Sequence, residues 1–155
     1  YGPYGRPDMA LFKFTKNIIS QKPIDVFNYG SHKRDFTYID DITEVLSRII
    51  DNPARSNLKW NSNNPDPSSS SAPYKIYNIG NSKPINLMDY IKAIENNLQK
   101  KAIINFKPLQ PGDVNTTYAD VKDLEKDFNY KPKTDIKVGI NKFISWYNDF
   151  YKGHN

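Results

Sequence analysis

The small number and short length of its strand-like segments most restrict the fold that this chain can adopt. Four segments predict strands, at 24–27, 34–39, 74–79 and 102–106, and apolar and polar residues alternate in the second and third of them. Helical periodicity predicts helices at 9–20, from 40 or 41 to 50, at 86–98, in a short stretch from 120, and from 134 or 135 to 151. We therefore expect an α/β fold. The strands are too few and too short for a doubly wound parallel sheet of about six strands, so we expect a smaller lobe that docks on something else.

Side chains typical of helix starts precede these helices. Asp40 or Asp41 is expected to cap the second helix. Asn86, with Asp89 three residues later, is expected to cap the third in a capping-box-like pair.

Residues 52–73 show the least regular pattern of the chain. They contain four prolines and a run of serines at 68–71. We expect a single domain over 1–155 with a long surface loop at this point. A linker between two domains is the alternative.

Composition argues against several kinds of site. The 155 residues carry a net charge of +5 and no cysteine, which excludes a disulfide framework and thiolate metal ligands. With only His32 and His154, a zinc site is not expected. The positive charge favours anionic partners, but the lysines are scattered and form no basic stripe, so we expect no nucleic-acid binding. No stretch approaches the roughly 20 apolar residues of a membrane span.

The first nine residues form a loop of two prolines, two glycines and two tyrosines around Arg6. A guanidinium is a planar fork suited to a carboxylate or phosphate. The alternative is a surface turn in which Arg6 is a solvated charge. Because no initiator methionine precedes this loop, we expect a chain cut from a longer protein close to its active site.

A second polar segment, 33–41, leads from a strand into a helix. Arg34 suits a diphosphate, which accepts strong bidentate hydrogen bonds. Alternatively, Arg34 pairs with Asp35 or a neighbouring carboxylate and holds the strand end. The Asp40–Asp41 pair resembles a catalytic carboxylate dyad, but it is more typical of a helix N-cap residue and its neighbour in the first turn.

A third polar segment is the turn at 110–114. Gly112 permits a tight turn and Asp113 can accept hydrogen bonds from a sugar; an ordinary Pro-Gly turn is the alternative. No glycine-rich fingerprint follows a strand, and no lysine stands at the spacing that would activate Tyr147. We therefore expect neither catalytic nor cofactor-binding residues in this chain.

The order of these segments is more specific than any one of them. The segments that matter are the loop 1–10, Arg34–Asp41, Tyr77–Gly80, Gln110–Val114 with Ala119–Asp120, and Trp146–Tyr147. In this order they resemble the C-terminal half of the extended short-chain dehydrogenase/reductase family, and in particular its NAD-dependent UDP-glucuronate 4-epimerase group. The resemblance covers nearly the whole chain. It implies the substrate-binding lobe of that fold, with the Rossmann sheet largely missing and the N-terminal NAD-binding domain outside this chain.

The resemblance also implies how the sugar and the base are held. Arg6 would face the sugar and contact the hexuronate carboxylate. Asp8 and Met9 would offer contacts at the nucleotide, and Phe27 would lie against the uracil ring.

For the rest of the nucleotide, the resemblance implies that Arg34 clamps the diphosphate with Phe36 beside it, near the ribose. Asp113 would accept from the ribose hydroxyls. Many relatives carry a second diphosphate arginine where this chain has Gln110, which leaves Arg34 as the main clamp.

In this family, NAD takes hydride from C4 of the sugar while a tyrosine, with a lysine four residues on, takes the hydroxyl proton. These groups belong to the preceding half. The resemblance thus implies the UDP-sugar-binding part of a cytoplasmic, homodimeric isomerase that makes UDP-galacturonate for polysaccharide, inactive alone. The alternatives are a nucleotide-sugar dehydratase or decarboxylase of the same family, or a non-catalytic UDP-sugar-binding or assembly module.

Overall fold

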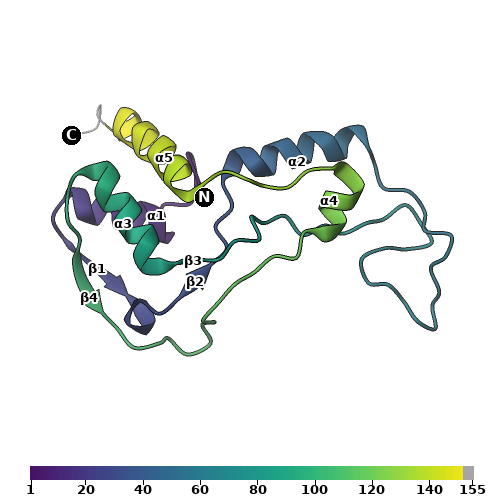
Figure 1. Ribbon diagram of the computed structural model, residues 1–155, viewed down its shortest axis with the longest axis horizontal. Helices are drawn as coiled ribbons and strands as arrows, with labels where there is room; N and C mark the ends of the chain where they lie inside the picture. The colour runs from purple at the N-terminus through teal and green to yellow at the C-terminus, as the bar shows by residue number, and fades with distance from the viewer. Residues whose placement is uncertain (152–155) are drawn as a thin grey trace.

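The computed structural model describes residues 1–151 and contains five α-helices among short strands (Figure 1). The elements in chain order are α1 (Ala10–Ile19), β1 (Pro23–Val26), the 3-10 turn η1 (Phe27–Gly30), β2 (Lys33–Arg34), α2 (Ile39–Asp51), β3 (Ile85–Asn86), α3 (Leu87–Leu98), β4 (Ile103–Phe106), α4 (Lys122–Phe128) and α5 (Ile136–Tyr151). The predicted mixed α/β character with five helices and few short strands is confirmed.

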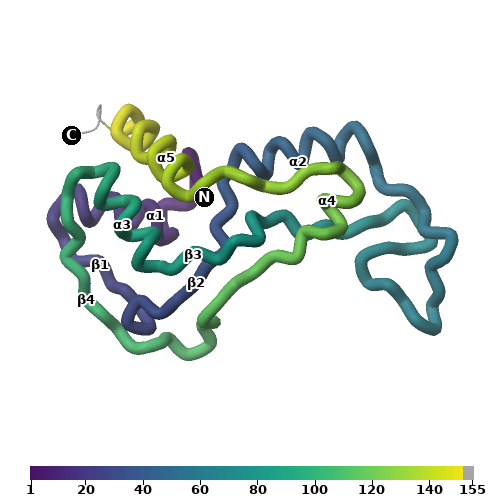
Figure 2. Tube along the Cα trace, viewed as in Figure 1, coloured from purple at the N-terminus to yellow at the C-terminus, as the bar shows by residue number. Residues whose placement is uncertain are grey.

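The larger of two hydrophobic clusters lies where α3 packs against both α1 and α5 (Figure 2). Helical spacing places the apolar side chains of each helix on one face, and these faces meet. The side chains at its centre are almost fully buried and include Ile18, Ile91, Ile94, Ile140 and Phe143. This cluster holds α1 in place, and α1 follows directly after the Arg6 loop.

The strands form two separate two-stranded sheets among the described residues. β1 and β4 are parallel, with Pro23 opposite Ile103 and Val26 opposite Phe106. β2 and β3 are antiparallel, with Arg34 opposite Ile85. In β1, Ile24 and Val26 are buried and Pro23 and Asp25 are exposed, as expected for a strand with one buried face.

A smaller hydrophobic cluster joins α2 to α4 on the other side of the molecule, at the right in Figure 1. Val45, Val121 and Leu124 form its buried centre. The apolar face of α2 is only partly covered, because Leu46 is 48% exposed and Ile50 is 78% exposed.

Residues 52–84 contain no helix or strand; in Figure 2 the segment extends to the right beyond α4 and then returns toward β3. The segment is nevertheless ordered by its own hydrogen bonds. The backbone nitrogen of Asn57 donates to the Ser70 carbonyl at 2.8 Å, and Ser56 and Pro73 form an isolated bridge.

Asp66 accepts hydrogen bonds within residues 52–84, the segment called the excursion below. Its carboxylate accepts from the backbone nitrogen of Ser68 at 2.9 Å and from the Ser69 hydroxyl at 2.7 Å. The hydrogen bonds from Ser69 and Ser68 lower the pKa of Asp66 to about 2.

The predicted strand at 74–79 is wrong. Lys75 forms only an isolated bridge with Ser69, and the backbone nitrogen of Ile76 donates to the Ser68 carbonyl at 2.8 Å. Alternation indicates which side chains share a face, but a strand also needs a neighbouring strand, and the described residues supply none here.

Two other strand predictions were too long. Of the predicted strand 34–39 only Arg34 pairs in a sheet, together with the preceding Lys33, and Phe27 belongs to η1 rather than to β1. Asn28 and Tyr29 both have positive φ, near +50°, which ends the extended backbone at once.

The predicted cap of α2 is also wrong. Tyr38 occupies the N-cap position, and neither Asp40 nor Asp41 makes a capping hydrogen bond. Asp41 is 5% exposed and instead accepts from the backbone nitrogen of Thr134 at 3.0 Å and from the Tyr130 hydroxyl at 3.2 Å. It therefore ties α2 to the segment that precedes α5.

The predicted caps at the starts of α3 and α5 have different outcomes. Asn86 is the N-cap residue of α3 but makes no capping bond to the backbone; its amide donates to Asp89 at 3.3 Å. Asp135 accepts from the backbone nitrogen of Lys137 at 2.9 Å, which confirms a cap at the start of α5.

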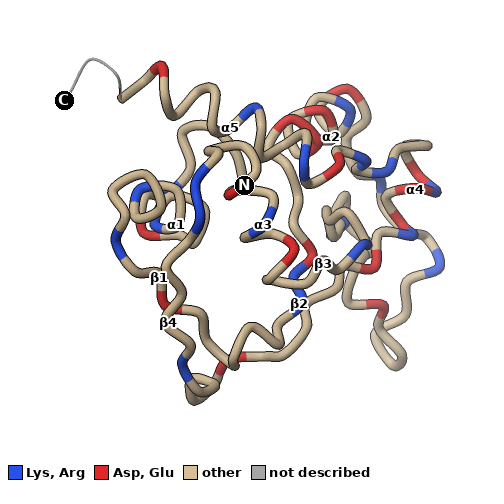
Figure 3. Tube along the Cα trace, turned by 60° about the vertical axis from the view of Figure 1, so that its left-hand side comes forward, with Lys and Arg blue, Asp and Glu red and all other residues tan. Residues whose placement is uncertain are grey.

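Charged residues are distributed along the chain rather than gathered in one segment. Figure 3 shows lysines and arginines at many points of the trace, interspersed with acidic residues. Within residues 1–151, no helix is long and apolar enough to cross a bilayer.

Candidate functional site

The start of the chain lies along the segment that follows β2. The backbone nitrogen of Tyr1 donates to the Thr37 carbonyl at 2.7 Å, and the Tyr1 carbonyl accepts from Ile39 at 2.9 Å. The Tyr1 ring makes edge contacts with Phe36 and Tyr38. Two of the predicted polar segments, the Arg6 loop and the Arg34 segment, are therefore neighbours in space.

Arg6 is exposed and forms a bidentate ion pair with Asp8. Its Nε donates to Asp8 Oδ1 at 3.1 Å, and Nη2 donates to Oδ2 at 2.5 Å. This hydrogen bonding lowers the pKa of the Asp8 carboxyl. The geometry shows the Arg6 fork holding a carboxylate at the protein surface.

An apolar hollow of about 490 Å³ lies beside this ion pair. Arg6, Met9 and Phe36 all line it, together with Gly5 and the start of α1. Phe36 is fixed by face-to-face stacking on the buried Tyr90, with ring centroids 4.2 Å apart. Three of the predicted substrate residues thus share one hollow.

A second hollow of about 550 Å³ adjoins the first at Ala10, which lines both. Asp8, Phe27 and Gln110 line it, although they come from segments far apart in the sequence. The parallel pairing of β1 with β4 explains their approach, because Phe27 and Gln110 follow these two strands.

Arg34 and Asp113 form a third cluster outside both hollows. Arg34 Nη2 donates to Asp113 Oδ1 at 2.9 Å, and Nη1 donates to the carbonyls of Lys33 and Asn115 at 3.0 and 3.2 Å. Arg34 therefore pairs with a carboxylate, as the alternative proposed, but with a distant one rather than Asp35.

Asp35 binds two backbone segments instead of Arg34. Its carboxylate accepts from the backbone nitrogens of Ser82 and Ala119, each at 3.0 Å. Gly80 packs here so closely that a Cβ would overlap with Ala119. Asp35 thus connects the Arg34 strand to both segments that reach the α2–α4 cluster.

Sequence reasoning missed His32. Its side chain is 4% exposed, and its Nε2 lies 3.4 Å from Asp113 Oδ2. A histidine in a polar turn gave no signal of this contact, because its partner lies far along the chain. His154 falls outside the described residues.

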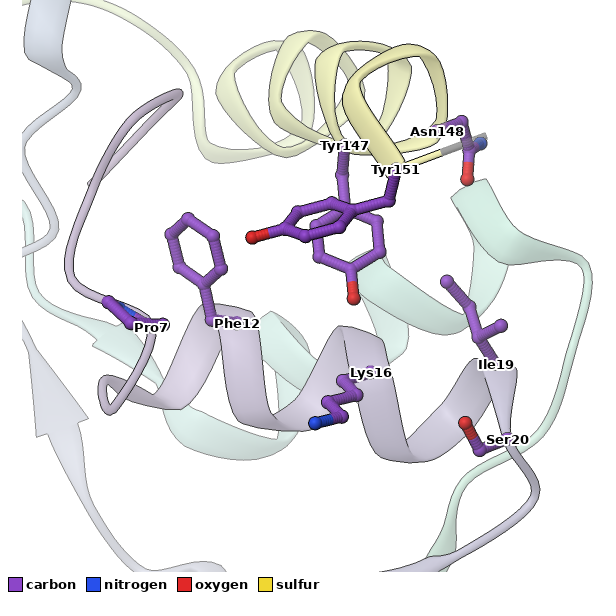
Figure 4. Close-up of a pocket in the computed structure, with 8 residues that line it drawn as sticks. All are labelled: Pro7, Phe12, Lys16, Ile19, Ser20, Tyr147, Asn148 and Tyr151. Carbon is purple, nitrogen blue, oxygen red and sulfur yellow. The ribbon is translucent and has the colours of Figure 1, made fainter. Parts of the chain in front are cut away.

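Another hollow, of about 380 Å³, separates α1 from the end of α5 (Figure 4). The aromatic rings of Phe12, Tyr147 and Tyr151 face it, and Lys16 lies at its edge. None of the eight predicted site residues lines this hollow.

Residues 1–151 do not contain the glycine-rich turn that is typical of a dinucleotide site. A dinucleotide site needs a strand that enters a helix through a glycine-rich turn. β1 leads into η1, β3 runs into α3 without a glycine, and β4 leads into a loop. No residue of this chain is therefore assigned to the cofactor.

Comparison with known proteins identifies the family. Residues 1–80 match the model of the NAD-dependent epimerase/dehydratase family. The chain belongs to this family. Its architecture matches the C-terminal part of extended short-chain dehydrogenase/reductase structures, as expected from the resemblance.

Family members with similar sequences include protein CapI of Staphylococcus aureus, which is 57% identical over 98% of this chain and 46% of its own length. A probable UDP-glucuronate 4-epimerase of Rhizobium meliloti is 39% identical over 98% of this chain and 45% of its own length. The chain thus spans slightly less than half the length of these relatives.

Among solved structures of the family, UDP-glucuronic acid 4-epimerase from Bacillus cereus, in complex with UDP-glucuronic acid and NAD, is similar with a TM-score of 0.78 and 26% identity. The match covers 97% of this chain and 43% of that one. The NAD-dependent epimerase/dehydratase fold therefore accounts for nearly every described element.

Proposed function

We propose that this chain is the nucleotide-sugar-binding part of a UDP-glucuronate 4-epimerase. One observation carries the proposal. Six residues assigned to the substrate line two adjoining hollows, with Arg6, Met9 and Phe36 in one and Asp8, Phe27 and Gln110 in the other. The similarity to epimerases acting on UDP-glucuronate supports the choice of substrate.

Arg6 would recognise the uronate carboxylate. Its fork already holds the Asp8 carboxylate with two donors in the geometry that a uronate group would accept. The bound sugar would replace one carboxylate partner of Arg6 with another, while Asp8 and Met9 would contact the nucleotide. A neutral hexose offers Arg6 no such partner, so this contact would set the preference for uronates.

The nucleotide would extend into the second hollow. Phe27 offers an aromatic surface for the uracil ring, and Gln110 offers a neutral amide at the same hollow. Arg34 would bind the diphosphate, with Phe36 beside it and Asp113 accepting from the ribose hydroxyls. Gln110 has no charge, which leaves Arg34 as the main cation for the phosphates.

The hydride transfer itself would be supplied by NAD bound outside these residues. The catalytic tyrosine and lysine would also lie there, so that the 155 residues alone would bind the substrate without converting it. We further propose that the intact protein is cytoplasmic and homodimeric, and binds neither nucleic acid nor membrane.

The test compares two sugars that differ at the carboxylate. In the natural protein that carries these residues, Arg6→Ala should weaken UDP-glucuronate about tenfold or more, since a charge-assisted pair is lost. UDP-glucose binding should change little. Arg55→Ala, which removes an exposed arginine that lines neither hollow, is the matched control. Equal weakening of both sugars by Arg6→Ala would refute the carboxylate contact.

A further inference from the structure

His32 is a buried polar residue that the proposed site leaves unused. Its imidazole is 4% exposed, and Nε2 makes no hydrogen bond within residues 1–151. Buried polar atoms nearly always have a partner. The nearest carboxylate oxygen is Asp113 Oδ2, at 3.4 Å from Nε2.

The backbone around His32 is held from two sides. The His32 carbonyl accepts from the backbone nitrogen of Leu87 at 2.9 Å, where α3 begins. The next residue, Lys33, donates to the Asn115 carbonyl at 2.9 Å. His32 is therefore held in place by its backbone and its burial. Asp113, by contrast, has a side chain that is 32% exposed and lies in the loop between β4 and α4.

Arg34 and His32 contact different oxygens of the same carboxylate. Arg34 Nη2 lies 2.9 Å from Oδ1, and His32 Nε2 lies 3.4 Å from Oδ2. A diphosphate bound by Arg34 would compete with Asp113 for the guanidinium donors. Since His32 is buried, it is shielded from that competition and can keep Asp113 in place.

We propose that His32 is a positioning residue that holds the Asp113 carboxylate toward the ribose. The proposal rests on the nucleotide-binding role given to Asp113 above. A shortening of the 3.4 Å contact by a few tenths of an ångström would bring it into the usual range of an N–H···O bond. The donor is Nε2–H, which defines the tautomer that the site needs.

The experiment compares UDP with 2′,3′-dideoxy-UDP, which lacks both ribose hydroxyls. Affinities are measured by isothermal titration calorimetry on the natural protein that carries these residues. His32→Leu removes the donor. His32→Gln retains an amide N–H at about the reach of Nε2 and serves as the conservative rescue. If His32→Leu does not fold, His32→Asn replaces it, because its amide is too short to reach Asp113.

His32→Leu should weaken UDP about tenfold and the dideoxy analogue less than about twofold, the size expected for one hydrogen bond to a charged group. His32→Gln should stay close to the unmodified protein for both ligands. In an Asp113→Asn background, His32→Leu should have little further effect.

Two results would overturn the proposal. A purely structural role predicts equal weakening of both ligands by His32→Leu and no rescue by His32→Gln. If instead the unmodified protein binds both ligands equally and Asp113→Asn changes neither affinity, the ribose contact of Asp113 fails as well. The first result leaves the ribose contact of Asp113 standing, and the second does not.

Discussion

Arg34 donates to the Asp113 carboxylate at 2.9 Å, across a separation of 79 residues in the chain. This ion pair brings together the strand that begins the Arg34 segment and the Pro-Gly turn at 110–114. Both residues are proposed to contact the nucleotide, so the substrate would bind where two distant segments already meet.

The first prediction concerns Arg34 itself. In the natural protein, Arg34→Ala should weaken UDP by about tenfold to a hundredfold, the range expected for charge-assisted hydrogen bonds. The UDP affinity of Arg34→Lys should lie between those of the unmodified protein and Arg34→Ala, because lysine keeps the charge but lacks the planar fork. Arg55→Ala, in the excursion, removes the same charge as a control. UDP affinity unchanged by Arg34→Ala would rule out the diphosphate clamp.

The second prediction uses the close contact between Gly139 and Tyr1. A Cβ at Gly139 would overlap with the buried Tyr1 phenol. In an ordinary helix, Gly→Ala adds about 1 kcal/mol of stability. Here Gly139→Ala should lower the free energy of unfolding by about 1–3 kcal/mol through overpacking.

The same contact provides its own control. The Tyr1 hydroxyl has no hydrogen-bond partner in the described residues, and it is the atom nearest to the added methyl. Tyr1→Phe should therefore recover only part of the loss in the Gly139→Ala background, as measured by denaturant unfolding, because the ring carbons Cζ and Cε2 still lie 2.7 and 2.8 Å from the added methyl. A Gly139→Ala variant more stable than the parent would contradict the packing described here.

The third prediction separates two adjacent carboxylates. Asp41→Ala leaves the Thr134 N–H and the Tyr130 hydroxyl without their buried acceptor, and should cost about 2–4 kcal/mol of unfolding free energy. Asp40→Ala breaks only an exposed ion pair with Lys142 and should cost less than about 1 kcal/mol. Similar losses for the two variants would contradict the assignment.

The fourth prediction is a pH dependence in the excursion. The pKa of Asp66 is lowered from the ordinary value of 3.8 to about 2 by hydrogen bonds from Ser69 and Ser68. Because the folded-state pKa is depressed, the stabilisation is present above pH 3.8 and is lost as the pH falls through about 2.

NMR can follow the excursion directly. The Ser68 amide proton should titrate with a midpoint near 2, and Asp66→Asn should abolish the transition. A midpoint near 3.8 would show that the hydrogen bonds around Asp66 are not formed in solution.

Local patterns predicted the helices well, because their information lies in side chains three and four residues apart. In α3, Tyr90, Ile91 and Ile94 share the predicted face and are buried. In α2 the pattern was equally regular, yet Ile50 is 78% exposed. Periodicity identifies an apolar face but not what covers it.

Long-range contacts were the part that the sequence could not predict. The segment 74–79 alternates as well as β1 does, but only β1 finds a partner strand, at β4. The pairing of His32 with Asp113 gave no local signal for the same reason. The family resemblance suggested the polar site residues, whereas the structure showed which of the suggested residues share a hollow.

The most direct test of the central claim is proton NMR of UDP-glucuronate incubated with the natural protein and NAD. The account predicts that signals of UDP-galacturonate appear and grow to an equilibrium mixture, with no loss of carbon dioxide. Signals of a UDP-pentose, of a stable keto sugar, or of unchanged UDP-glucuronate alone would contradict it.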